Sequence, residues 1–126
     1  MKKLIALSAI AISVSMAISG QALAHGAKPK HGGVINSARD LTFELVGKDG
    51  KAVIYVDDHG ANLATAGATG TLTVLSGGKK SETVLQPSGA NTLTSKTPIQ
   101  LAGGAKAVAS ITLAGKEAVS VRFSHK

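Results

Sequence analysis

Residues 41–57 read "LTFELVGKDGKAVIYVD", and this stretch decides the fold class. In its first part Leu41, Phe43 and Leu45 alternate with other residues, which is the period of two that a half-buried strand requires. The sequence "GKDG" at 47–50 is typical of a tight turn, and the apolar run that follows it predicts a second strand. We therefore expect these residues to form an antiparallel β-hairpin.

The same alternation recurs twice further along the chain. Residues 71–87, with Gly77-Gly78 in the middle, and residues 105–123 each predict another hairpin. Short strands are expected near Val34 and Leu93, and the glycine-rich residues 59–70 read as a long connection with room for a short edge strand. The prediction is an all-β domain of about seven or eight mostly antiparallel strands, either an immunoglobulin-like sandwich or a small barrel.

The beginning of the chain is typical of an export signal. Two lysines precede an uncharged apolar run, and Ala22-Leu23-Ala24 offers the small residues that signal peptidase reads. We expect a signal peptide over 1–24, cleavage between Ala24 and His25, and a periplasmic mature protein. At about 15 residues the apolar run is shorter than the roughly 20 that a membrane span needs, so no stable membrane insertion is expected after cleavage.

The mature chain divides into two parts in this interpretation. Residues 25–33 form a flexible terminus rich in histidine, glycine and lysine, and residues 34–126 form a single β domain. The mature chain keeps 12 cationic and 7 acidic side chains, a formal charge of +5. Nucleic-acid binding is not expected despite this charge, because the chain is exported and has only three aromatic residues to stack on bases.

Composition also argues against several kinds of chemistry. The chain has no cysteine, so it contains no disulfide, no thiolate nucleophile and no thiolate metal site. It has no G-x-S-x-G sequence, and its one prominent pair of carboxylates is Asp57-Asp58. We therefore expect a protein that is not an enzyme.

The N-terminus that the expected cleavage would create at His25 is the first candidate metal site. Cleavage before His25 would place a free α-amine beside an imidazole, a pair of nitrogen donors that suits Cu(II). His31 lies six residues later and could supply a further ligand, although Lys28 and Lys30 would repel a cation. The alternative is that His25 is simply the first residue of a frayed terminus.

The sequence "YVDDHG" at 55–60 is the second candidate. If the strand continues, Asp57 and His59 project from one face, and with Asp58 they could reach the same ion. The alternative is a polar strand end whose aspartate accepts backbone hydrogen bonds from a turn. His125 is expected at the solvent-exposed rim of the last strand.

Several short segments together resemble a family of small periplasmic proteins found alongside heavy-metal efflux systems. The order and spacing of these segments carry the resemblance: "HGG" at 31–33, "FELV" at 43–46, "YVDDHG" at 55–60, "LTVLSGGKK" at 72–80 and "LQP" at 85–87. They are also similar to a β-rich module in periplasmic adaptor subunits of cation-exporting resistance-nodulation-division pumps. The resemblance implies metal handling in the periplasm, with His31, Asp58 and His59 at the matching positions.

A looser similarity is to periplasmic copper carriers whose N-terminal histidine binds Cu(II) together with a later Asp-x-His. Here Met1 and Met16 are the only methionines and both belong to the signal, so a thioether site for Cu(I) is excluded. The leading hypothesis is a protein that binds copper(II) or zinc(II), or else nickel or cobalt, through His25, His31, Asp57, Asp58 and His59, and that sequesters the ion or delivers it to an efflux pump. The alternative is an envelope adaptor or interaction module that binds no metal.

Overall fold

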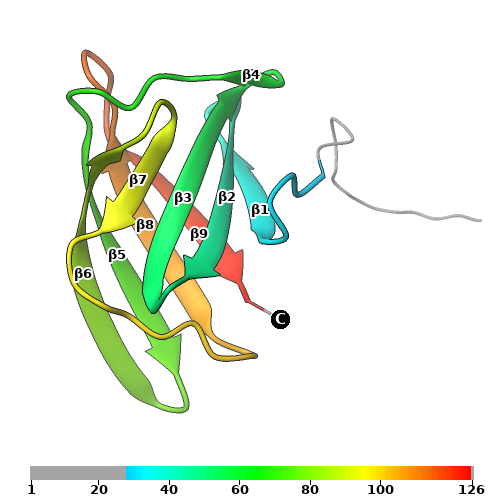
Figure 1. The fold of residues 1–126 in the computed structure, drawn as a ribbon, viewed down its shortest axis with the longest axis vertical. Helices are drawn as coiled ribbons and strands as arrows, with labels where there is room; N and C mark the ends of the chain where they lie inside the picture. Colours follow the sequence, from blue (N-terminus) through cyan, green and yellow to red (C-terminus); the bar gives the residue numbers. More distant parts are fainter. Residues whose placement is uncertain (1–27, 126) are drawn as a thin grey trace, which may run out of the picture.

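The computed structural model describes residues 28–125, and this part of the chain is built from strands and turns (Figure 1). Its strands are β1 (Val34–Ala38), β2 (Leu41–Lys48), β3 (Lys51–Asp58), β4 (Ala61–Asn62), β5 (Thr69–Ser76), β6 (Lys79–Ser88), β7 (Thr92–Ser95), β8 (Lys106–Thr112) and β9 (Val119–Ser124). The all-β prediction is confirmed. No helix within these residues has the length and hydropathy to cross a bilayer. The signal peptide and the cleavage site before His25 lie outside the described residues.

All the strands belong to one antiparallel sheet that curls into a nearly closed barrel. The strand order is β1-β2-β3-β7-β6-β5-β8-β9, and β4 adds a short pairing to the end of β3. The two terminal strands of this order, β1 and β9, lie side by side, and the side-chain amide of Asn36 donates a 2.7 Å hydrogen bond to the carbonyl of Arg122. Of the two expected architectures, the structure therefore has the small barrel.

The three predicted hairpins are confirmed as β2–β3, β5–β6 and β8–β9. The β2–β3 turn has Asp49 and Gly50 at φ of +55° and +78°, the left-handed geometry that matches the twist of a two-residue hairpin. The strands expected near Val34 and Leu93 are β1 and β7, and the 59–70 connection contains the short strand β4.

The core is formed by alternate side chains that point into the barrel. Because the chain is poor in aromatic residues, aliphatic side chains fill most of this space, and burial of their apolar surface is the main stabilising contribution. The largest fully buried apolar residues are Phe43, Leu45, Ile54, Leu72, Leu85, Leu93, Ile111, Val56, Val74 and Val121. Buried polar side chains have hydrogen-bond partners. For example, the Ser95 hydroxyl accepts a hydrogen bond from the backbone N–H of Ala52 at 3.0 Å.

The barrel has two ends with different turns. The β1–β2, β3–β4 and β8–β9 turns lie at one end, the upper end in Figure 1. The β2–β3 and β5–β6 turns and the beginning of β8 lie at the opposite end. Of the predicted metal ligands, the four that lie within the described residues, His31, Asp57, Asp58 and His59, are therefore distributed between the outer face of β2 and β3 and the upper end.

Candidate functional site

The site is organised around Glu44, an acidic residue in the middle of β2. Its neighbours Phe43 and Leu45 are buried in the core, so alternation directs Glu44 to the outer face of the barrel, opposite Tyr55 of β3. Glu44 is nevertheless only 5% exposed. It is covered by residues 28–33, here called the N-terminal segment, which cross the outer face of β2 and β3.

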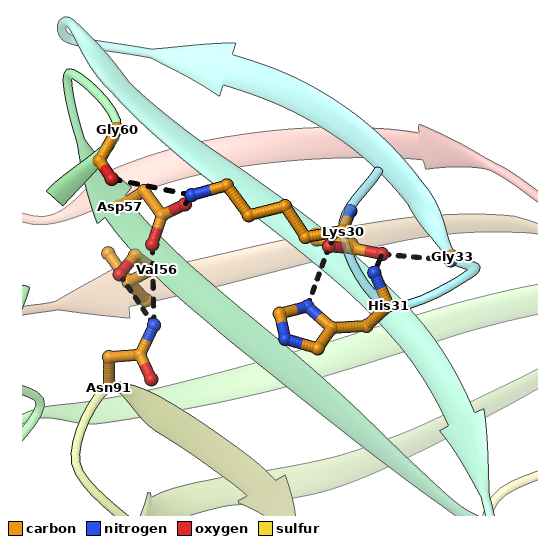
Figure 2. A network of polar contacts seen from close by, with 8 residues as sticks. Lys30, His31, Gly33, Val56, Asp57, Gly60 and Asn91 are labelled. Carbon is orange, nitrogen blue, oxygen red and sulfur yellow. Dashed lines mark hydrogen bonds and ion pairs between the residues drawn. The ribbon is translucent and has the colours of Figure 1, made fainter. Parts of the chain in front are cut away.

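The carboxylate of Glu44 fixes this segment by hydrogen bonds to its backbone. Oε1 accepts from the N–H of Lys30 at 3.0 Å, and Oε2 accepts from the N–H groups of His31 at 2.8 Å and Gly33 at 2.9 Å. The Nδ1 atom of the His31 ring lies 3.0 Å from Oε1 (Figure 2). The sequence predicts a flexible terminus over 25–33, and the described part of it, residues 28–33, is held against the sheet.

These contacts determine which form of the carboxyl group is stable. Burial would raise the pKa of Glu44, but the hydrogen bonds from Gly33, His31 and Lys30 outweigh this effect and hold the pKa below its usual value. The carboxylate is thus ionised at neutral pH and can only accept hydrogen bonds. Nδ1 of His31 therefore carries the proton in this contact, and in the neutral ring the lone pair lies on Nε2.

The imidazole of His31 is also fixed in orientation. It stacks on the ring of Tyr55, with centroids 3.6 Å apart and an interplanar angle of 5°. Its side chain is 38% exposed, so the ring is accessible to solvent while one nitrogen is bound to Glu44. A histidine whose Nδ1 is held by a carboxylate presents Nε2 in the arrangement found for metal-ligating histidines in many proteins.

Asp57 lies on the same outer face but already has a cation as its partner. The ammonium of Lys30 is 2.9 Å from Oδ2 of Asp57 and donates to the carbonyl of Gly60 at 3.3 Å (Figure 2). On its other side, the amide of Asn91 donates to Oδ1 of Asp57 at 3.3 Å. Asp57 is 14% exposed, so in this conformation Lys30 occupies the position that an ion bound to this carboxylate would need.

Asp58 and His59 form a separate pair at the upper end of the barrel. Strand β3 ends at Asp58, and His59 lies in a turn with φ of +52°, so the alternation that would align Asp57 with His59 does not continue. The ring Nδ1 of His59 is 2.6 Å from Oδ1 of Asp58. Both residues line a hollow beside Arg39 and Glu117, which are themselves paired at 3.0 Å.

The predicted ligands are therefore divided among three contacts in the part of the chain that the structure describes: His31 with Glu44, Asp57 with Lys30, and Asp58 with His59. Asp58 is three residues beyond Tyr55 along β3, about 10 Å from the His31 stack. Among residues 28–125 no three histidine or acidic side chains gather closely enough to hold a metal ion. His25, the remaining predicted ligand, lies outside these residues.

Sequence reasoning did not single out Glu44 or Tyr55. Glu44 occupies a solvent-facing position of an ordinary alternating strand, and its burial depends on a segment 11 to 14 residues earlier in the chain. No pattern in the sequence around Glu44 indicates such a contact. His125 lies near the opposite end, where its Nδ1 is 3.2 Å from the carbonyl oxygen of Ala102.

Comparison of the chain with known protein families, curated proteins and solved structures finds no match.

Proposed function

We propose that this protein is a periplasmic carrier of a divalent metal ion, copper(II) or zinc(II) or else nickel or cobalt, and that it delivers the ion to an efflux system. The observation that supports this most directly is the contact of His31 with Glu44. The carboxylate holds Nδ1, the Tyr55 ring supports the imidazole, and Nε2 is left as the donor. Imidazole suits copper, zinc and nickel alike, so the histidine does not select among them.

One imidazole alone holds an ion weakly, so the proposal requires further donors. The amine and imidazole of His25, made available by the expected cleavage, would supply two nitrogens six residues before His31. Asp57 could join them if the ammonium of Lys30 moved away from it. Asp58 and His59 are not part of this proposed site, because their contact is at the upper end of the barrel.

Isothermal titration of the mature protein with Cu(II), Zn(II), Ni(II) and Co(II) tests this proposal. We expect binding of at least one ion, a loss of about 10-fold or more in affinity for His31→Gln, and no change for the matched variant His125→Gln. A variant with one additional residue before His25 should lose the contribution of the terminal amine. A flat trace with all four ions would reject the proposal and favour the alternative function, an adaptor or interaction module that binds no metal.

A further inference from the structure

The two ends of the barrel differ in charge. The end with the β2–β3 and β5–β6 turns is rich in cations that are wholly or partly exposed, while Asp49 and Glu82 are the acidic residues near it. The ion pairs found within residues 28–125 involve none of these lysines. They are Lys48, Lys51, Lys79, Lys80, Lys96 and Lys106.

The upper end has a mixed charge instead. Arg39 there is paired with Glu117, and Asp58 is paired with His59. Within residues 28–125, the excess of positive charge is therefore concentrated at the lysine-rich end. Unpaired cations on one side of a small molecule produce a field that attracts anionic surfaces and orients the molecule toward them.

An exposed apolar side chain lies among these cations. Leu75, near the end of β5, is 51% exposed, which makes it one of the two large hydrophobic residues at the surface of the described chain. In the register of the sheet it lies opposite Lys80 of β6 on one side and opposite Lys106 of β8 on the other. Because cross-strand partners point to the same face, the three side chains form one row, Lys80–Leu75–Lys106, beside the β5–β6 turn.

The chemistry of this row favours one class of partner. Lysine ammonium groups are hydrated point charges on flexible stems, and they do not provide the planar, bidentate recognition of arginine. The row also has no aromatic side chain, which argues against stacking on nucleobases and against an anchored protein interface. Anionic lipid headgroups need no fixed geometry, and an apolar residue between two cations can enter the boundary between headgroups and acyl chains.

We propose that the lysine-rich end docks the protein, through the row Lys80–Leu75–Lys106 and the β5–β6 turn, on a membrane surface that contains anionic phospholipids. The remaining lysines of that end add long-range attraction, and each lysine near such a surface strengthens binding by roughly fivefold. The metal-binding proposal is independent of this surface, because the N-terminal segment lies on the outer face of β2 and β3.

Co-sedimentation of the mature protein with vesicles tests the inference. Vesicles of equal parts phosphatidylglycerol and phosphatidylcholine should bind the protein, and added salt should weaken this binding. Vesicles of phosphatidylcholine alone should not bind it. The variant Lys79→Gln/Lys80→Gln should bind about 25-fold more weakly, and Leu75→Ser about fivefold more weakly with its salt dependence retained.

The matched control is Lys28→Gln/Lys116→Gln, which removes the same charge outside the lysine-rich end and should bind nearly as well as the unaltered protein. Equal weakening by the two double variants would show that only net charge matters and would overturn the proposed surface. Absence of binding to the phosphatidylglycerol vesicles would do the same. Tighter binding to immobilised polyglutamate than to the vesicles would identify an acidic polypeptide as the partner and would also overturn it.

Discussion

Glu44 accepts hydrogen bonds from three backbone N–H groups of the N-terminal segment and from the His31 ring. A buried carboxylate with this many donors is stable only while the donors remain in place, because an ionised group without partners is costly to bury. Docking of the segment and ionisation of Glu44 therefore support each other.

Acidification should release the N-terminal segment from β2, because it protonates Glu44. The pKa of Glu44 in the folded protein lies below its usual value of 4.5, so the folded state binds this proton more weakly than the unfolded state. The contribution of ionised Glu44 to the free energy of unfolding is therefore fully present above pH 4.5. It is lost as the pH falls through the lower pKa that Glu44 has in the folded protein. We expect the His31 and Tyr55 ring signals in NMR spectra to lose their stacking shifts over that acidic range. Glu44→Gln should show weakened stacking already at neutral pH, and an unchanged spectrum of this variant would contradict the prediction.

The second prediction concerns the close approach of the segment to β2. A Cβ atom at Gly33 would overlap the carbonyl oxygen of Leu45 and lie 2.7 Å from Cγ2 of Val46. Gly33→Ala should therefore displace the segment and expose Glu44, with a loss of about 1–3 kcal/mol in the free energy of unfolding. Urea denaturation measures this loss. Gly32→Ala is the control, because Gly32 has open space around it and should show only the cost of its positive φ.

At the scale of an element, the β1–β2 turn has an unusual composition. Arg39 and Asp40 have φ of +52° and +66°, so both central positions of this two-residue turn are left-handed without a glycine. The β2–β3 turn has the same geometry with the favourable pair Asp49-Gly50. Residues with a Cβ atom are sterically disfavoured in the left-handed region, so the β1–β2 turn is the less stable of the two turns.

We expect Asp40→Gly to raise the free energy of unfolding by about 0.5–1 kcal/mol, because glycine adopts a positive φ without steric cost. Gly50→Ala should have the opposite effect, a loss of about 1 kcal/mol, since the space around Gly50 is open and only its φ of +78° is unfavourable. Thermal unfolding of both variants measures the difference. A destabilised Asp40→Gly would show that the aspartate makes a compensating interaction.

At the scale of the whole molecule, closure of the barrel depends on the contact between β1 and β9. These strands lie side by side without a ladder of backbone pairs, and the 2.7 Å hydrogen bond from Asn36 to the carbonyl of Arg122 joins them. Asn36→Ala should raise the rate of amide hydrogen exchange in β1 and β9 while leaving β5 and β6 unchanged. Uniform exchange rates across the sheet in this variant would indicate that other contacts hold the barrel closed.

Local patterns in the sequence predicted much of the fold. Alternation and turn residues identified the β2–β3, β5–β6 and β8–β9 hairpins, because their partners are close in the chain. The insertion of β7 between β3 and β6 was not predictable in this way, since the pairing Ile54↔Leu93 joins residues 39 apart. Strand order is set by packing among distant segments. The alternation of apolar residues along one strand does not indicate which distant strand becomes its neighbour.

The candidate site was less predictable for the same reason. The polar, glycine-rich sequence of residues 28–33 is typical of a flexible terminus, and its position depends on Glu44 in another element. Alternation predicted that Asp57 would share a face with His59, but it did not indicate the actual partner of Asp57, Lys30, which is 27 residues earlier in the chain. The separation of Asp58 and His59 from Asp57 follows from the end of β3 at residue 58, and strand ends are poorly marked in sequence.

The side-by-side arrangement of β1 and β9 has a consequence for colloidal behaviour. An open strand edge is a template on which further chains can pair, and long assemblies of stacked strands grow from such templates. In this molecule the terminal strands of the sheet lie side by side and are joined by the hydrogen bond of Asn36, so neither offers a freely approachable row of amides and carbonyls to a neighbour. A concentrated solution of the intact protein should therefore resist fibril growth.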